Sequence, residues 1–405
     1  MLKKYLDRMK PHFEPGGKLH AFHSVFDGLE TFLYTPETTS KSGVHIHDSL
    51  DSKRVMIIVV LALLPCLLFG MYNTGYQNLL GSGATEFPFW SIMAYGFLAI
   101  LPRIIVTYVV GLGIEFAVAQ WRGEEIQEGF LVTGILIPLI CPIETPVWML
   151  AVATAFSVIF VKEVFGGTGY NIFNVALVTR AVLFFGYPAQ MSGDHAFIAT
   201  KPILGLGGTV TYADGISGAT PLGQIATANG GDFVIHNIIG QPISDWDAFL
   251  GLIPGSFGET STLCILIGAA ILLFTGIASW RIMASVVVGG LFMGFIANTF
   301  ATPTYPASYL TPLQQLLYGG FAFAAVFMAT DPVTAARTGL GKYIYGFMVG
   351  VIAVIIRTYN NGYPEGAMLA VLLMNALAPL IDYCVVQTNI SRRMRRLKAK
   401  TEQAS

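Results

Sequence analysis

The amino-acid sequence contains ten apolar runs, and these runs restrict the chain to folds that cross a lipid bilayer. A helix that spans the hydrocarbon core needs about 20 mainly apolar residues. Charged residues make up only 12% of the chain, whereas soluble domains carry about 25%. We therefore predict an all-α polytopic membrane protein with about ten transmembrane helices. The predicted spans are 55–71, 97–118, 129–141, 147–163, 171–187, 259–278, 282–300, 313–330, 343–357 and 364–383.

The lysines and arginines predict the orientation, because cytoplasmic loops are enriched in them. The polar segment 1–54 holds eight, the C-terminal segment 384–405 holds six, and loops on the same side add five. Only Lys201 and Arg357 fall on the other side. We therefore expect both termini in the cytoplasm. Segment 1–54 does not resemble a signal peptide, and the long connection 188–257 is expected in the periplasm.

The connection 188–257 divides the chain into two halves, 55–187 and 258–383, with five predicted spans in each. An odd number of spans in each half makes the halves inverted relative to each other across the membrane. Inverted repeats with ligand sites at their interface are common in transport folds. A short interrupted segment opens at 131–134 in the first half, and a similar one ends at 328–331 in the second. This similarity supports a repeat, although Gly-rich apolar stretches also resemble one another by chance.

The cysteines and histidines predict no metal or iron–sulfur centre. The four cysteines lie far apart, without a CxxC pair or a Cys/His cluster, and are expected to be small buried side chains. Five of the seven histidines lie in segment 1–54 without metal-site spacing, and the net charge of −1 argues against a nucleic-acid partner. The chain also lacks a glycine-rich dinucleotide-binding signature, so it is not expected to take electrons from NADH by itself.

The segment 214–220 reads DGISGAT and lies in the predicted periplasmic connection. Its form, D-x-x-[ST]-G-A-T, matches the acceptor motif of bacterial flavin transferases, which move FMN from FAD onto a threonine hydroxyl as a phosphodiester. Small neighbours let an extended chain enter an enzyme cleft, and the hydroxyl is the nucleophile. We predict covalent FMN on Thr220. The motif residues are Asp214, Ser217, Gly218, Ala219 and Thr220.

A second copy of the letters SGAT, at 82–85, tests how specific this motif is. The residue three positions before Ser82 is Leu79, where the full motif requires an acid. Thr85 is therefore not expected to carry flavin, because four common small residues are weak support by themselves. An ordinary Asp/Gly/Ser turn is the alternative interpretation of 214–220.

Besides the DGISGAT motif, six further stretches resemble sequences of one known family: 12–18, 162–169, 185–194, 253–256, 328–332 and 363–366. With them, nearly the whole chain resembles the B subunit of the Na⁺-translocating NADH:quinone oxidoreductase. The resemblance implies FMN on Thr220, a second non-covalent flavin (riboflavin), electron transfer to ubiquinone and a location in a bacterial cell inner membrane. Segment 72–96 is short for that family. Gly111 lies in a region that the family associates with quinone but lacks the second glycine expected after it. We add Phe13 and Phe130 as candidate quinone contacts.

A glycine-rich turn before the fifth predicted span is the second candidate flavin site. Such a turn at the start of a helix can admit a ring system or an anion. It also permits close packing between helices, so both interpretations stay open. The candidate residues are Gly166, Gly167, Thr168, Asn171 and Asn174.

Charged residues within or beside the spans are further candidates. Glu115 and Asp382 lie near cytoplasmic ends of spans and are candidates for the Na⁺ path, because acids at membrane depth are costly and usually functional. Acids that cap helices or reach to the interface are the alternative. Asp331 is expected to cap or break a helix. Arg103 and Arg180 each need an anionic partner, which is a structural acid or carbonyl or, alternatively, a flavin phosphate.

Together these features predict one subunit of a larger redox pump. Other subunits would deliver electrons to the FMN, and electrons would pass through riboflavin to ubiquinone while Na⁺ moves outward. A flavin transferase would act during maturation, and the basic tail would contact anionic membrane lipid. The nearest alternative is the D subunit of the Rnf ferredoxin:NAD⁺ oxidoreductase, which we expect to lack the polar stretch beginning at His12. A solute transporter without redox activity would suit inverted halves but not the flavin motif.

Overall fold

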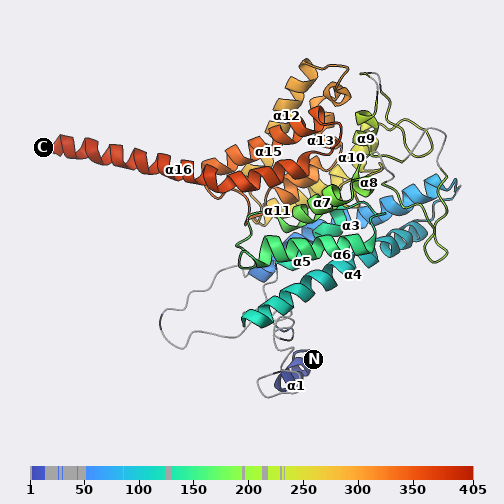
Figure 1. Cartoon of the computed structure of the whole chain (residues 1–405), viewed down its shortest axis with the longest axis horizontal. Helices are drawn as coiled ribbons and strands as arrows, with labels where there is room; N and C mark the ends of the chain where they lie inside the picture. Colours follow the sequence, from blue (N-terminus) through green and yellow to red (C-terminus); the bar gives the residue numbers. More distant parts are fainter. Residues whose placement is uncertain are drawn as a thin grey trace.

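A computed structural model describes most of the chain and shows it as helical (Figure 1). The described residues are 2–13, 26, 30, 43, 52–84, 86–123, 129–193, 197–211, 218–228, 230–231 and 233–404. Within them, β-pairing is limited to two isolated bridges, so the predicted all-α class is confirmed. The described residues do not include Thr85 of the SGAT segment 82–85, nor Asp214 and Ser217 of the DGISGAT segment 214–220.

The first half of the chain forms helical segments that follow the first five predicted spans in order. They are α3 (Ser52–Gly81), α4 (Phe89–Arg122), α5 (Phe130–Ile140), α6 (Val147–Ser157) with its π-helical continuation η2 (Val158–Glu163), and α7 (Val175–Gly186). Helix α4 packs against α3, α5 and α6. Small residues allow this close contact, because a Cβ added at Gly96 would collide with the Met71 carbonyl of α3.

The second half repeats this pattern of packing. Its segments are α11 (Thr262–Phe274), α12 (Trp280–Thr299), the 3₁₀ turn η3 (Pro306–Tyr309), α13 (Pro312–Leu317), α14 (Phe321–Phe323), the π-helix η4 (Ala324–Met328), α15 (Gly339–Tyr359) and α16 (Ala367–Ala404). Helix α12 packs against α13 and α15, as α4 packs against α5 and α6. A Cβ at Gly350 would collide with the Val286 carbonyl. The recurrence supports a repeat, and the inversion of the halves stays a prediction.

Five of the described helices are long and apolar enough to cross a membrane. They are Lys53–Gly81, Phe89–Arg122, Trp280–Thr299, Gly339–Tyr359 and Ala367–Ala399. Shorter apolar helices are Phe130–Ile140, Val175–Gly186 and Thr262–Phe274. The predicted span 313–330 is interrupted, because α13 ends at Leu317 and helical structure resumes at Phe321. Helix length therefore supports five crossings, and the number ten stays a prediction.

Helix α3 runs further than the sequence predicted. The expected linker 72–96 is mostly helical, and only residues 82–88 join α3 to α4. Polar side chains of this stretch bind the connection between the halves: Asn73 donates to the Ile253 carbonyl at 3.0 Å, and Asn78 donates to the Ala199 carbonyl at 2.9 Å. Helix α3 therefore continues past the predicted end of the first span, where these amides find partners in the connection, and the membrane boundary itself stays a prediction.

The connection and the C-terminal tail complete the architecture. Short helices α8 (Pro188–Met191), α9 (Pro221–Ala226) and α10 (Asp245–Leu250) lie in the connection, and α1 (Leu2–Phe13) lies near the N-terminus. The predicted basic tail is a continuation of α16, which extends away from the other helices in Figure 1.

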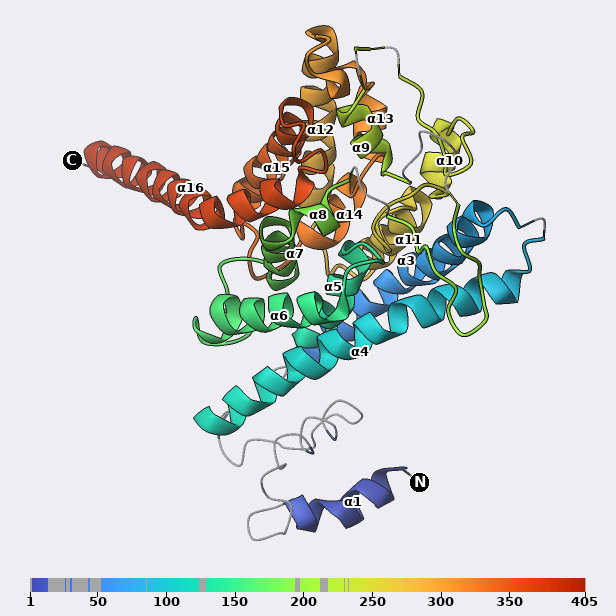
Figure 2. The same ribbon diagram turned by 45° about the vertical axis from the view of Figure 1, so that its right-hand side comes forward.

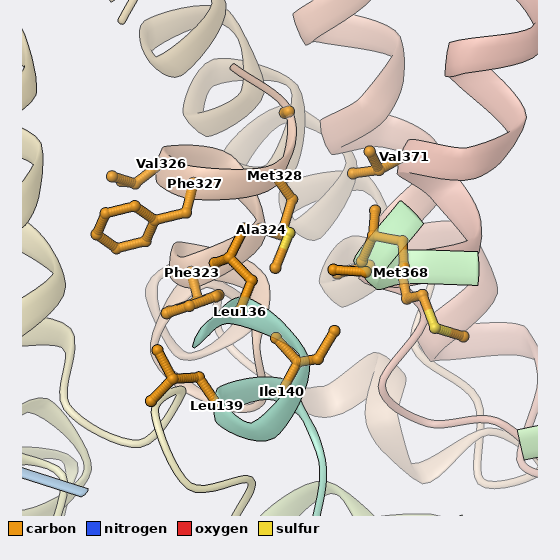
Figure 3. Packing of buried hydrophobic residues seen from close by; sticks show 14 of the residues in the cluster. Leu136, Leu139, Ile140, Phe323, Ala324, Val326, Phe327, Met328, Met368 and Val371 are labelled. Carbon is orange, nitrogen blue, oxygen red and sulfur yellow. The ribbon is translucent and has the colours of Figure 1, made fainter. Parts of the chain in front are cut away.

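The two halves meet around their interrupted segments. Figure 2 shows α5, α7, α11 and α14 between the α3–α4 pair and the α12–α15–α16 group. Figure 3 shows apolar side chains of α5, α14, η4 and α16 gathered in one buried cluster. The labelled members are Leu136, Leu139, Ile140, Phe323, Ala324, Val326, Phe327, Met328, Met368 and Val371. Interrupted helices are tolerated here because they are covered by protein rather than by lipid.

Candidate functional site

Thr220, the predicted flavin acceptor, is the N-cap of α9 and is only 4% exposed. Its Oγ1 accepts a hydrogen bond from the Gly223 amide at 3.1 Å and donates to the Gly193 carbonyl at 3.3 Å. The Thr220 amide also donates to the Gly193 carbonyl, at 2.9 Å. Gly218 has a φ of +68°, a left-handed conformation that glycine adopts without strain. The motif residues Gly218 and Ala219 therefore lead into a buried helix start at which the Thr220 hydroxyl is the N-cap.

Thr220 borders a narrow cavity that reaches toward the interface between the halves. The cavity is lined by Thr220, Pro221, Ile253, Pro254, Gly255, Ser256, Glu259, Thr260, Gly319, Gly320 and Glu365. A neighbouring narrow cavity contains both glutamates again, together with Arg180 and Met328. The proposed attachment site is thus next to a buried charged cluster.

Arg180 of α7 is the centre of that cluster and contacts two carboxylates of the other half. Its Nη1 is 2.8 Å from Glu259 Oε1, and its Nη2 donates to Glu365. The three side chains are between 6% and 10% exposed, so the pairing joins the halves at a buried position. Arg103, the other arginine within a span, donates from Nη1 to the Ala99 carbonyl of its own helix at 2.7 Å. Both arginines therefore have the structural partners expected, an acid or a carbonyl.

A much larger cavity lies between the halves near Lys162 and the loop 329–338. It contains about 870 Å³ of empty space, part of which is open to solvent. Apolar side chains of α3, α5, α11 and η4 form most of its wall. The polar or charged residues in the wall are Thr133, Lys162, Thr168, Asn171, Asn174, Thr330 and Asp331. The enclosed part of this cavity is about 120 Å³, and a largely apolar wall with a few polar groups has the character of a small-molecule site.

Three of the five turn residues predicted to bind flavin lie in this wall. Asn174 caps α7 by accepting from the Leu177 amide, and its Nδ2 donates to Asp331 at 3.2 Å. Thr168 Oγ1 is buried and has no hydrogen-bond partner among the described residues. Such a buried, unpaired hydroxyl is costly unless a ligand satisfies it. The apolar wall and this orphaned group fit a flat ring system with a polar edge, such as a flavin.

The two remaining turn residues serve the turn itself. Gly166 and Gly167 have φ values of +114° and +91°, and neither is among the residues that line the cavity. The Gly167 amide donates to the Lys162 carbonyl at 3.0 Å, which closes the end of η2. These glycines therefore place Thr168 rather than contacting a ligand in this structure.

Asp331 follows η4 and is hydrogen-bonded on both carboxylate oxygens. Oδ1 accepts from the Val333 amide at 3.0 Å, and Oδ2 accepts from Thr334 Oγ1 at 3.1 Å and from Asn174. Burial raises the pKa of the Asp331 carboxyl, although these hydrogen bonds act to lower it. The contacts are those of a residue that fixes a turn, in line with the sequence prediction.

Glu115 pairs with Lys162, a residue that the sequence alone indicated only as a cytoplasmic charge. Lys162 Nζ donates to the Glu115 carboxylate, and the two side chains are 6% and 5% exposed. The ammonium also lies 5.9 Å from the centre of the Phe130 ring. A lysine inside a predicted span needs a partner at depth, and that signal could have indicated the pairing.

Asp382 is a helix-capping residue of the structure. Its carboxylate accepts from the Arg337 amide at 2.7 Å and from the Thr338 amide at 2.9 Å, at the start of α15. This geometry matches the capping alternative, and the Na⁺ role of Glu115 and Asp382 stays a prediction. Across the part of the chain that the structure describes, no group of three or more His, Cys, Asp or Glu could hold a metal ion.

The quinone candidates are only partly brought together. A Cβ added at Gly111 would overlap the Phe130 ring, so Gly111 allows that ring to pack against α4. Phe130 is fully buried, and its ring packs directly against the backbone at Gly111. Phe13 lies in α1, where its ring stacks on Phe26 at 4.6 Å. The quinone contacts stay predictions.

Comparison with known proteins supplies independent information about the chain. Residues 39–391 match the family described as the NQR2, RnfD, RnfE family. A protein of Chromohalobacter salexigens, named as the B subunit of Na(+)-translocating NADH-quinone reductase, is 43% identical over 98% of this chain and 96% of the relative. Proteins with the same name from Klebsiella pneumoniae (strain 342) and Pseudomonas paraeruginosa are 43% and 42% identical, each over 98% of this chain and 99% of the relative.

Proposed function

This chain belongs to the NQR2, RnfD, RnfE family, and from that premise we propose that it is the B subunit of a Na⁺-pumping NADH:quinone oxidoreductase. The observation that carries the proposal is an identity of 42–43% to several subunits of that name along 98% of the chain. Apolar helices of membrane-spanning length support a multi-pass protein of the inner membrane. Both termini would lie in the cytoplasm and Thr220 in the periplasm.

Covalent FMN on Thr220 is the first element of the proposed chemistry. The DGISGAT sequence supports it, as does the position of Thr220 at a cavity that continues toward the interface between the halves. The flavin would supply electron transfer when bound. Gly218 and Ala219 would orient the acceptor. The narrow cavity beside Ser256 and Gly320, about 20 Å³ in volume, would have to widen to admit the attached group.

A non-covalent flavin, riboflavin, is the second element, and we place it in the larger cavity between the halves. Thr168, Asn171 and Asn174 would bind its polar edge, and the apolar wall would hold the ring. The orphaned Thr168 hydroxyl supports this assignment because it lacks a partner among the described residues. Electrons would then reach ubiquinone, and Na⁺ would move outward past Glu115 and Asp382.

The remaining partners follow from the proposed electron path. Other subunits of the complex would deliver electrons from NADH, a flavin transferase would attach the FMN, and anionic lipid would contact the basic end of α16. In an Rnf-type complex, which the matched family also includes, the same flavins would exchange electrons without ubiquinone. The relatives named above favour the quinone reductase. Ubiquinone-dependent oxidation of NADH by the purified complex would separate the two.

The covalent flavin can be tested with two matched substitutions. Thr220→Val is expected to abolish the ultraviolet-excited fluorescent band of this chain on a denaturing gel, because it removes the acceptor oxygen. Thr85→Val changes the same residue type in a second SGAT segment and is expected to leave the band intact. The reverse pattern would refute the assignment, and mass spectrometry of the peptide containing Thr220 would identify the added group.

A further inference from the structure

Lys162 places a positive charge in the wall of the larger cavity, and the proposed function gives it no role. Its side chain is 6% exposed and lines the cavity with Thr168 and Asn171. Among the described residues in this wall, the other ionisable one is Asp331, whose carboxylate already accepts three hydrogen bonds. Lys162 is therefore the group that can present a cation to a ring bound in the cavity.

Glu115 holds the same ammonium from α4. Both side chains are buried, so little water screens the pair. The neighbouring Glu163 is engaged elsewhere: Arg122 Nη2 donates to its carbonyl at 2.7 Å, and Arg122 Nη1 lies 3.9 Å from its carboxylate. The Lys162–Glu115 pair carries no net charge, and a bound ring would therefore experience less positive potential than beside Lys162 alone.

We propose that Lys162 stabilises the reduced form of the flavin in this cavity and that Glu115 sets the strength of this effect. The inference rests on the proposed flavin site. One electron from a reduced donor flavin, entering without a proton, adds one negative charge to the ring. The ammonium keeps its proton and offsets that charge, whereas the Glu115 carboxylate opposes it. Removing one partner of the pair should therefore have the opposite effect to removing the other.

The purified full chain carrying Thr220→Val allows a direct measurement, because by the proposal riboflavin is its remaining flavin. Titration with dithionite, followed by flavin absorbance, gives the midpoint potential. Lys162→Gln is expected to lower this potential and Glu115→Gln to raise it. Each shift should reflect about a tenfold change in the ratio of reduced to oxidised flavin, which is about 59 mV for one electron. Lys162→Arg keeps the charge and should return the potential close to the parent value.

The opposite signs separate this role from a merely structural one. If the pair only held α4 and η2 together, breaking it from either side would loosen the cavity and move the potential in the same direction. A Glu115→Gln potential that is unchanged or lower overturns the inference. If Lys162→Gln loses its riboflavin, the Glu115→Gln and Lys162→Arg measurements decide the question.

A control on the parent chain separates failure of the inference from failure of the proposed function. Denaturation should release riboflavin from the purified chain. Its absence from the parent would contradict the proposed flavin site itself. Its presence with the same midpoint potential in all variants would leave the site intact and overturn only the role of Lys162.

Discussion

Beside the narrow cavities that adjoin Thr220, Arg180 binds two carboxylates, Glu259 and Glu365, whereas beside the larger cavity Lys162 binds one, Glu115. We call these regions the Thr220 end and the cavity end. The cavities beside Arg180 are narrow, and the cluster occupies their walls. The cavity beside Lys162 has a volume of about 120 Å³, against about 20 and 10 Å³ for the two beside Arg180.

The difference between these two regions shows that a buried ion pair can serve two purposes. A guanidinium offers five donors in a fixed plane and can bind two acids at once, so Arg180 ties segments of both halves together. An ammonium is a compact charge on a flexible stem, and Lys162 faces both an acid and an open cavity. We infer that the Thr220 end holds the halves in place and that the cavity end responds to what is bound.

The largest expected effect is on stability at the Thr220 end. Arg180→Gln leaves Glu259 and Glu365 buried without their cation, and breaking a buried pair from one side costs about 3–5 kcal/mol. We expect a markedly lower thermal unfolding midpoint for the purified chain. Arg103→Gln is the matched control, because that arginine donates to a carbonyl of its own helix. Equal destabilisation by both substitutions would contradict a special role for the cluster.

A smaller effect is expected on ion dependence at the cavity end. Glu115→Gln and Asp382→Asn should retain Thr220-bound FMN but require more Na⁺ for half-maximal quinone reduction. A loss of about 1–3 kcal/mol in ion binding corresponds to roughly a 5- to 150-fold higher concentration. We expect Asp382→Asn to have the weaker effect, since its carboxylate caps α15. Activity that falls equally at every Na⁺ concentration would show that these acids are structural.

The smallest expected effect concerns the orphaned hydroxyl in the cavity wall. Thr168→Val keeps the shape of the side chain and removes its hydrogen-bonding group. Loss of one hydrogen bond to riboflavin should weaken binding by about 0.5–1.5 kcal/mol, roughly 2- to 12-fold. Thr133→Val, in the same wall, is the control and should bind riboflavin normally. Equilibrium dialysis measures both, and equal weakening would argue against a specific contact with Thr168.

The sequence predicted the apolar segments well because burial in lipid requires continuous apolar length, which is a local property. It did not predict where α3 ends, because Asn73 and Asn78 resemble loop residues until their carbonyl partners, more than 100 positions away, are known. The sequence indicated an interrupted segment that ends at 328–331, but it did not indicate the position of the break between α13 and α14. An interrupted helix inside protein has the same apolar composition as a continuous one.

The candidate site could be predicted only as separate parts. The turn with Thr168, Asn171 and Asn174 was identified from its composition, and the structure places these residues in one cavity wall. Their surroundings come from both halves, and no local pattern encodes that arrangement. The partner of Glu115 is 47 residues away, and those of Arg180 are 79 and 185 residues away. Such pairings depend on tertiary packing, so the sequence indicated that partners were needed but not which ones.

The burial of Thr220 has a consequence for how the protein is made. A hydroxyl that is 4% exposed and bonded to Gly193 and Gly223 is out of reach of another enzyme's active site. Once esterified, its oxygen has no hydrogen left to donate to the Gly193 carbonyl. Proposed attachment at Thr220 therefore belongs to an early stage of biogenesis, before this segment settles against residue 193. A chain whose Thr220 segment packs before FMN is attached would stay without its cofactor unless the segment reopened. The timing of export relative to folding would therefore determine the yield of active complex.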